Sequence, residues 1–175
     1  MKRGQLMIEA SASAGFPMAV AYCHLTGWNG MKKDQKKAFD EFVKIEKDTN
    51  GYHWAQLMIG ECYQYGYGTK KNKTKRFEWY KKSAEQGNSL AINNLGYCYD
   101  KGLGVAQNIK KGFELYEQSA LLGNSNGMYS VGICYEEGRG QALAKDVNNA
   151  KIWYTKALAQ GNMRVQSHLD LLNAA

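Results

Sequence analysis

The feature that most constrains this 175-residue chain is an internal period of about 36 residues. Glycines recur at intervals of 36 residues, and the last interval is 38 residues: Gly15, Gly51, Gly87, Gly123 and Gly161. Periods of about 20–50 residues are typical of arrays in which each repeat buries its apolar face only by stacking on its neighbours. The period therefore predicts a repeat array rather than a single globular core.

The residues around each glycine predict two helices per repeat. Helix A is expected from the residue after the glycine to a tyrosine twelve positions on, and a Gly-x-Gly turn follows it: Tyr63, Tyr99 and Tyr135 are these tyrosines. Helix B should begin after a column of residues that accept hydrogen bonds from the amides of a first helical turn: Asp34, Asn72, Asn108 and Asp146. It should end at the repeating glycine, which tolerates the left-handed backbone after a helix end. The next residue can cap the following helix A: Asn88, Asn124 and Asn162.

The predicted fold is all-α, a right-handed α-α superhelix, or solenoid, of helix-turn-helix repeats in a single array over residues 1–175. The predicted units are a partial helix B at 2–14, repeats at 15–50, 51–86, 87–122 and 123–160, and a terminal helix A at 161–172. The two extra residues of the last interval are placed in the loop at 140–144, because loop insertions cost little.

The repeated columns are Leu-Gly-x-x-Tyr in helix A, Gly-x-Gly in the turn, and Trp-Tyr-x-x-Ala-Ala-like in helix B, ending in Gln-Gly. In this combination the sequence resembles the SEL-one-like repeat family, a relative of the tetratricopeptide repeats, over about residues 2–172. The resemblance implies a non-catalytic scaffold or adaptor that binds a peptide or helix of a partner protein in its concave groove. An alternative is a regulatory module of a larger parent protein. Members of this family serve in signalling, in membrane-associated degradation complexes, beside kinases and in bacterial proteins that meet host cells.

Helical periodicity separates a core face from a binding face in helix A. Positions +4, +8, +11 and +12 after the glycine fall on one side and are apolar throughout. Positions +3, +6 and +10 fall on the other side, which lines the concave surface in solenoids of this order. That side carries aromatic and apolar residues beside amides, as a desolvated anchor surface does. The alternative is that tight curvature packs these residues against neighbouring repeats. The candidate partner-binding residues are Trp54, Leu57, Glu61, Leu90, Asn93, Tyr97, Asn126, Tyr129, Ile133 and Arg164.

The net charge of +7 is concentrated in clusters. A basic patch precedes and enters one predicted helix B: Lys70, Lys71, Lys73, Lys75 and Arg76. A second group precedes a similar helix: Lys32, Lys33, Lys36 and Lys37. Such runs are usually a solvated edge, and the alternative is a docking module for an acidic protein, anionic lipid or nucleic acid. Nucleic acid is the less expected partner, because the nearby aromatic residues Trp79 and Tyr80 belong to the repeating core pattern.

No residue pattern predicts catalysis, a cofactor or a metal site. Three cysteines share one helix-A column, and helix B has none: Cys62, Cys98 and Cys134. Relatives that staple each repeat use a cysteine pair, one per helix, so buried free thiols are expected here instead. Free thiols favour a cytoplasmic location, with secretion left open. The Gly-x-Gly turns lack the third glycine and the strand of a dinucleotide site. No apolar run approaches the roughly 18 residues of a membrane span.

Overall fold

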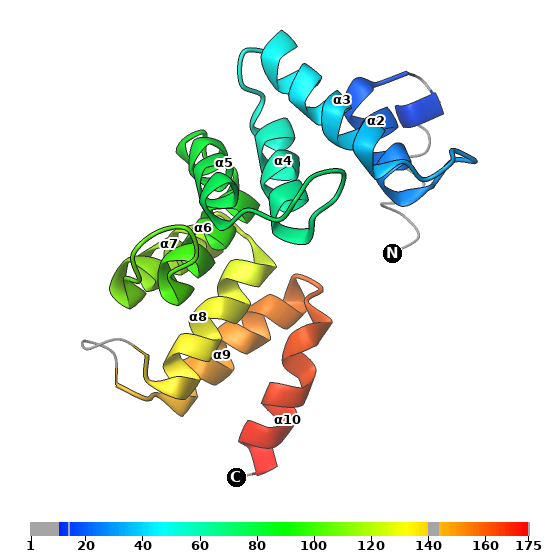
Figure 1. Cartoon of the computed structure of the whole chain (residues 1–175). Coiled ribbons are helices and arrows are strands. Elements are labelled where there is room, and N and C mark those ends of the chain that lie inside the picture. The colour runs from blue at the N-terminus through cyan, green and yellow to red at the C-terminus, as the bar shows by residue number, and fades with distance from the viewer. Residues whose placement is uncertain (1–10, 14, 140–143, 175) are drawn as a thin grey trace. The chain divides into compact units, whose positions relative to one another are not determined.

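The computed structural model describes residues 11–13, 15–139 and 144–174, and every regular element in these ranges is helical (Figure 1). The chain divides into two compact units, unit 1 (Met1–Ser83) and unit 2 (Ala84–Ala175). The elements in chain order are α2 (Pro17–Thr26), α3 (Gln35–Asp48), α4 (His53–Tyr65), α5 (Lys73–Glu85), α6 (Ser89–Lys101), α7 (Ile109–Leu121), α8 (Ser125–Glu137), α9 (Val147–Ala159), the 3-10 turn η1 (Met163–Val165) and α10 (Gln166–Ala174).

Helices that follow one another in the chain pack together within each unit. In unit 1, α2 packs on α3 and α3 on α4. In unit 2, α6 packs on α7, α7 on α8, α8 on α9, and α9 on α10. The predicted all-α class of helix-turn-helix repeats is therefore confirmed.

Asparagine and aspartate side chains begin the helices as the sequence predicts. At the start of α3, Oδ1 of Asp34 accepts a hydrogen bond of 2.9 Å from the amide of Lys37. Three residues of the same column form the same bond, each at 2.9 Å: Asn72, Asn108 and Asp146. The A helices end at glycines with left-handed backbone: Gly66, Gly102 and Gly138. These caps satisfy amides that have no acceptor within their own helix.

Asparagines at the junction between repeats use both ends of their side-chain amide. Oδ1 of Asn124 accepts from the amide of Gly127 at 3.1 Å and so caps α8. Its Nδ2 donates at 3.3 Å to Oγ of Ser89 in the preceding repeat. Asn162 likewise accepts from the amide of Arg164, and its Nδ2 donates at 3.1 Å to the carbonyl of Ser125. Each amide therefore starts one helix A and fixes it to the helix A before it.

The predicted core columns are buried in both units. Their residues at +4, +8 and +11 are Ala55, Ile59, Cys62, Ala91, Leu95, Cys98, Gly127, Val131 and Cys134. The tyrosines at +12 are only partly buried, and so are Trp79 and Trp153 of helix B. The largest fully buried rings are instead those of Tyr80 and Tyr154, which follow the two tryptophans.

Glycines in helix A make room for the buried tyrosines of helix B. A Cβ atom added to Gly132 would lie 2.4 Å from Cε1 of Tyr154, and one added to Gly96 would lie 2.9 Å from Cδ1 of Tyr116. Such distances are shorter than carbon atoms tolerate, so any larger side chain would displace the ring. Helices A and B therefore approach each other closely at Gly96 and Gly132.

The two ends of the predicted array differ in how much of them is described. Most of the predicted partial helix at 2–14 lies outside the described residues, although 11–13 are helical, and so does most of the loop at 140–144. The predicted terminal helix at 161–172 corresponds to η1 and α10. Its residues Val165 and Leu169 are buried in the core of unit 2.

Candidate partner-binding surfaces

Helices α4, α6 and α8 carry the face that the sequence assigns to partner binding. Trp54 and Tyr97 keep 40% and 45% of their surface exposed, although large aromatic side chains are mostly buried in folded proteins. Arg164 in η1 is also exposed. Six further candidates are partly exposed: Glu61, Leu90, Asn93, Asn126, Tyr129 and Ile133.

Leu57 is the exception among the candidates, because only 2% of its surface is exposed. Asn93 and Tyr129 occupy the equivalent position in α6 and α8 and stay partly exposed. Removing an apolar side chain from water is favourable, whereas burying an amide or hydroxyl without a partner is costly. Leu57 therefore belongs to the core and is removed from the candidate contact residues.

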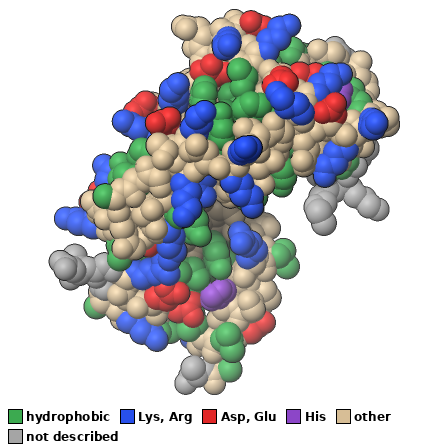
Figure 2. All heavy atoms as spheres, viewed as in Figure 1, with side chains coloured by type: hydrophobic (Ala, Val, Ile, Leu, Met, Phe, Trp, Pro, Cys, Tyr) green, Lys and Arg blue, Asp and Glu red, His purple; other side chains and the backbone are tan. Residues whose placement is uncertain are grey.

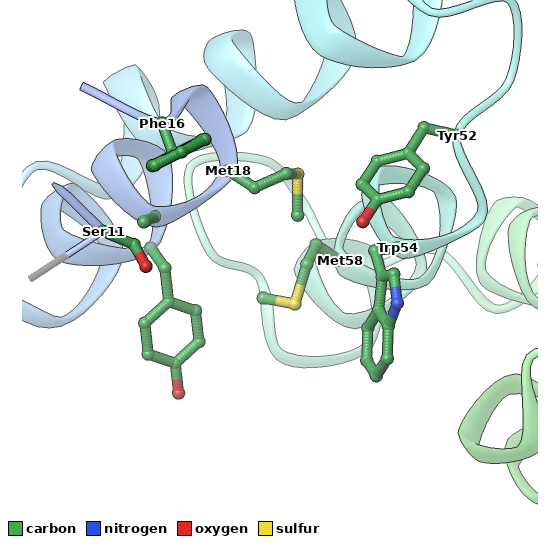
Figure 3. Close-up of a pocket in the computed structure, with 8 residues that line it drawn as sticks. Ser11, Phe16, Met18, Tyr52, Trp54 and Met58 are labelled. Carbon is green, nitrogen blue, oxygen red and sulfur yellow. The ribbon is translucent and has the colours of Figure 1, made fainter. Parts of the chain in front are cut away.

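Unit 1 contains an apolar hollow of about 540 Å³ between α2 and α4. Figure 3 shows Met18 of α2 and Met58 of α4 in its middle, with Tyr52 and Trp54 on the α4 side and Phe16 on the α2 side. Polarizable methionine side chains beside aromatic rings adapt to partners of different shape. This hollow can therefore accept apolar side chains.

Trp54 is the only residue lining this hollow that the sequence singled out. Three others, Met18, Ala19 and Tyr22, were missed because the helical-wheel assignment omitted α2, which is the helix A of the first repeat. Met18 stands three positions after Gly15, as Trp54 stands three positions after Gly51. The period itself therefore carried a signal that could have placed α2 on this face.

Glu61 flanks the same hollow. It follows Trp54 and Met58 by seven and three positions on α4, which places the three side chains on one helical face. Burial raises the pKa of the Glu61 carboxyl above its ordinary value. Burial and then the charge of Glu61 raise the pKa of Tyr22, which lines the hollow. A poorly solvated carboxyl group thus lies at the edge of an apolar surface.

Unit 2 contains a smaller hollow of about 210 Å³, and its walls are more polar. It brings together three candidates from α6 and α8: Tyr97, Tyr129 and Ile133. Ser130, also in its wall, donates a hydrogen bond from Oγ to Oδ1 of Asn93 at 3.1 Å. Four residues that the sequence assigned to one face are therefore neighbours in the structure.

A buried carboxylate lies in the wall of this second hollow. Asp100 is 4% exposed, and its Oδ2 lies 2.7 Å from Nη1 of Arg139 and 3.3 Å from Nζ of Lys101. Arg139 comes from the turn after α8, so this ion pair joins two successive repeats. The role of Arg139 could not be predicted from the repeat pattern, because the equivalent positions hold Tyr67 and Leu103.

A cluster around Tyr129 ties the last helix to α8. The Tyr129 hydroxyl lies 3.4 Å from Nε2 of His168, whose Nδ1 lies 2.9 Å from Oε2 of Glu136. The guanidinium of Arg164 lies over the Tyr129 ring, 5.4 Å from its centroid. Two candidates from separate elements, Tyr129 and Arg164, are therefore in contact.

The predicted basic patch is exposed at four of its five residues: Lys70, Lys71, Lys73 and Lys75. The assignment of Arg76 to this patch is wrong, because only 7% of its surface is exposed. Its Nε and Nη2 atoms have no hydrogen-bond partner among the described residues. The reason for its burial is its place in helix B, where other repeats hold buried small residues: Ala38, Gly112 and Ala150.

The cysteines are free and buried, as predicted: Cys23, Cys62, Cys98 and Cys134. Burial raises the pKa of both Cys62 and Cys134 to about 12. Within residues 11–13, 15–139 and 144–174, no three His, Cys, Asp or Glu side chains gather as a metal site requires. Over the same ranges, no helix combines the length and apolar character needed to cross a bilayer.

The family model described as Sel1 repeat matches four segments, which together cover most of the chain: residues 18–40, 55–88, 89–124 and 125–162. Comparison with curated protein sequences gives no match.

Several solved structures resemble this one. A protective antigen of uropathogenic Escherichia coli strains, c5321, which displays an SLR fold, is 30% identical with a TM-score of 0.77. A Sel1 repeat protein from Oxalobacter formigenes is 32% identical with a TM-score of 0.77. Cysteine-rich protein B from Helicobacter pylori is 25% identical with a TM-score of 0.58. The alignments cover 94%, 87% and 79% of this chain, but 35%, 60% and 96% of the three relatives, respectively. This chain thus spans about a third of the first relative and three fifths of the second.

Proposed function

Because this chain belongs to the Sel1 repeat family, we propose that it is a non-catalytic adaptor that holds segments of a partner protein in the hollows of its two units. Stacked helical repeats typically offer extended surfaces to other proteins. The buried free thiols support a reducing, cytoplasmic location as part of this proposal.

The exposure of Trp54 and Tyr97 is the observation that carries the proposal. Each is a large ring that the fold leaves 40% or 45% exposed, and each lines a hollow rather than a flat surface. Tryptophan, tyrosine and arginine dominate the binding energy of protein interfaces when they fill such concave positions. Water removed from these rings by a partner would supply the main driving force for binding.

The two hollows suit different parts of a partner. The hollow of unit 1 is lined almost entirely by apolar and aromatic side chains, so it suits an aliphatic or aromatic side chain. The hollow of unit 2 is lined by Tyr97 and by the ion-paired side chains of Asp100, Lys101 and Arg139, so it suits a polar group.

The test is a selection of displayed random peptides on the purified protein, followed by affinity measurements with the selected peptides. Trp54→Ala and Tyr97→Ala should each weaken binding of the peptides that occupy their hollow by about tenfold or more, as expected when a central aromatic side chain is truncated.

Ile152→Ala is the matched control, because Ile152 of α9 is 50% exposed and lines neither hollow. This control should bind the selected peptides as tightly as the unmodified protein. Selected peptides that bind Trp54→Ala and Tyr97→Ala with full affinity would show that the hollows are not the binding sites.

A further inference from the structure

Two groups of lysines, more than thirty residues apart in the sequence, lie on one part of unit 1. The first group flanks the start of α3, and the second flanks the start of α5. All eight side chains are exposed, and we refer to them as the lysine surface: Lys32, Lys33, Lys36, Lys37, Lys70, Lys71, Lys73 and Lys75. Figure 2 shows Lys and Arg side chains spread over much of the molecular surface in that view.

The turn between α4 and α5 brings the two groups together. Gly68 of this turn has left-handed backbone, and a Cβ atom added to it would lie 2.1 Å from the carbonyl oxygen of Gln35. The same atom would lie 2.8 Å from Cα of Lys36. The backbone of the turn therefore rests directly on the first turn of α3. Lysines two and three positions after Gly68, Lys70 and Lys71, consequently lie beside the first group.

Among the described residues of unit 1, few ion pairs neutralise this positive charge. Lys36 pairs with Asp40 at 2.5 Å, and neither α3 nor α5 has an acidic residue in its first turn. A helix start favours negative charge, so lysines there oppose the helix dipole. Unit 1 has 15 Lys and Arg residues against 8 Asp and Glu residues, whereas unit 2 has 8 of each. The whole net charge of +7 therefore belongs to unit 1, and an anionic partner would relieve the repulsion.

The neighbouring side chains favour carboxylates over nucleic acid. Every cation of the lysine surface is an ammonium group, which attracts anions as a point charge, and none offers the planar fork of arginine for bidentate contacts. The rings of Tyr63 and Phe39 are already engaged: Lys75 lies 5.3 Å from the Tyr63 centroid, and the two rings pack edge to face at 5.6 Å. Neither ring is therefore free to stack on a base.

We propose that the lysine surface is a docking site for an Asp- and Glu-rich segment of a partner protein. None of its eight lysines lines either hollow. The docking site is thus separate from the binding function proposed above and does not rest on it.

The chain itself provides a matched control. Lys37, Lys75 and Lys111 occupy the same position in their B helices, where the amide of each donates at 2.9 Å to the capping side chain. Lys110 and Lys111 are exposed like the others but belong to α7 of unit 2. The pair Lys110→Glu/Lys111→Glu therefore reverses as much charge as a pair in the lysine surface, and Lys111 stands at the position of Lys37 and Lys75.

The experiment measures the Kd of a fluorescent Asp/Glu-rich peptide by anisotropy at low and high salt, with the full chain. Lys71→Glu/Lys75→Glu and Lys33→Glu/Lys37→Glu should each raise this Kd about tenfold at low salt, because reversal removes attraction and adds repulsion. Lys110→Glu/Lys111→Glu should change it less than about twofold, and Trp54→Ala should leave it unchanged. Added salt should weaken the binding.

Three outcomes would overturn the proposal. The first is a loss of peptide binding in the Lys110→Glu/Lys111→Glu control as large as in the two unit 1 pairs. Such a result would mean that the net charge of the protein alone attracts the peptide. The second is loss of binding in only one of the two unit 1 pairs, because a single surface requires both. The third is tighter binding of RNA of equal charge, or of phosphatidylserine vesicles, with the same dependence on these lysines. Glutamate suits the first helical turns that hold Lys37, Lys75, Lys110 and Lys111. Lys33 and Lys71 are exposed outside the helices, so thermal melting should show all variants folded. Lys71→Gln/Lys75→Gln gives a charge-neutral comparison.

Discussion

The charge of Glu61 is disfavoured by the surroundings of this residue. Burial raises its pKa, so the folded protein holds the carboxyl proton more tightly than the unfolded chain does. The free energy of unfolding should therefore rise as the pH falls from above the pKa of Glu61 in the folded protein toward its lower pKa in the unfolded chain. Glu61→Gln removes the charge that is disfavoured at neutral pH. We expect the variant to unfold at higher urea concentration than the unmodified protein at neutral pH, and at the same concentration below the ordinary pKa of glutamate.

Urea titrations at a series of pH values measure this difference directly. Glu46→Gln is a suitable control on α3, because Oε1 of Glu46 has a hydrogen-bond partner, Nε2 of Gln56, at 3.3 Å. A Glu61→Gln variant that is less stable at neutral pH would show that the carboxylate has a compensating partner.

The four cysteine thiols should be unreactive toward alkylating reagents in the folded protein. All are buried, and burial raises the pKa of Cys62 and Cys134 to about 12. Only the thiolate reacts with iodoacetamide, so alkylation near neutral pH should require unfolding. Mass spectrometry should find almost no alkylation of the native protein and four modified cysteines in denaturant. Rapid alkylation without denaturant would place at least one thiol at the surface.

Single residues show where sequence reasoning succeeds and fails. The helix caps at Asp34 and Asn124 were predictable, because a cap depends on residues two or three positions away. Leu57 and Arg76 were not, because their exposure depends on which other helix covers them. Helical periodicity gives the direction of a side chain but not what lies in that direction.

The contact between helices A and B depends on a glycine facing a tyrosine. Gly132→Ala should destabilise the protein by about 1–3 kcal/mol, because the added methyl group would overlap the ring of Tyr154. Gly123→Ala is the control: its backbone is left-handed but nothing lies within 4 Å of an added Cβ atom, so only backbone strain of about 1 kcal/mol applies. Denaturant titration of both variants measures the difference. Unchanged or increased stability of Gly132→Ala would mean that the ring moves aside freely, because alanine is otherwise favoured over glycine inside a helix.

The order and type of the helices followed from the period, because both helix ends recur in every repeat. The hollow of unit 1 did not follow, since it depends on side chains of α2 that face Trp54 across space. The ion pair between Asp100 and Arg139 did not follow either, because it occurs once and so leaves no repeating signal. Repetition reveals what the repeats share, whereas binding sites arise where they differ.

At the scale of the whole molecule, stability should be local, because each helix packs mainly against its neighbours in the chain. Tyr154→Ala removes a fully buried ring and should cost about 3–5 kcal/mol. Hydrogen exchange followed by mass spectrometry should show faster exchange across α8, α9 and α10. Exchange in α2 and α3 should stay nearly unchanged. A uniform increase along the chain would instead indicate one cooperative fold.

The side-chain amides of Asn124 and Asn162, which hydrogen-bond to two successive repeats, restrict how the length of such a chain can change during evolution. Each joins consecutive repeats through a fixed number of residues, so an insertion at that junction would break a cap and a tether at once. The turn from helix A to helix B has no such constraint, and the one longer interval, from Gly123 to Gly161, is assigned to it. Proteins that descend from this chain should therefore differ in length mainly in those turns. Duplication of whole repeats should leave the asparagine junctions between repeats unchanged.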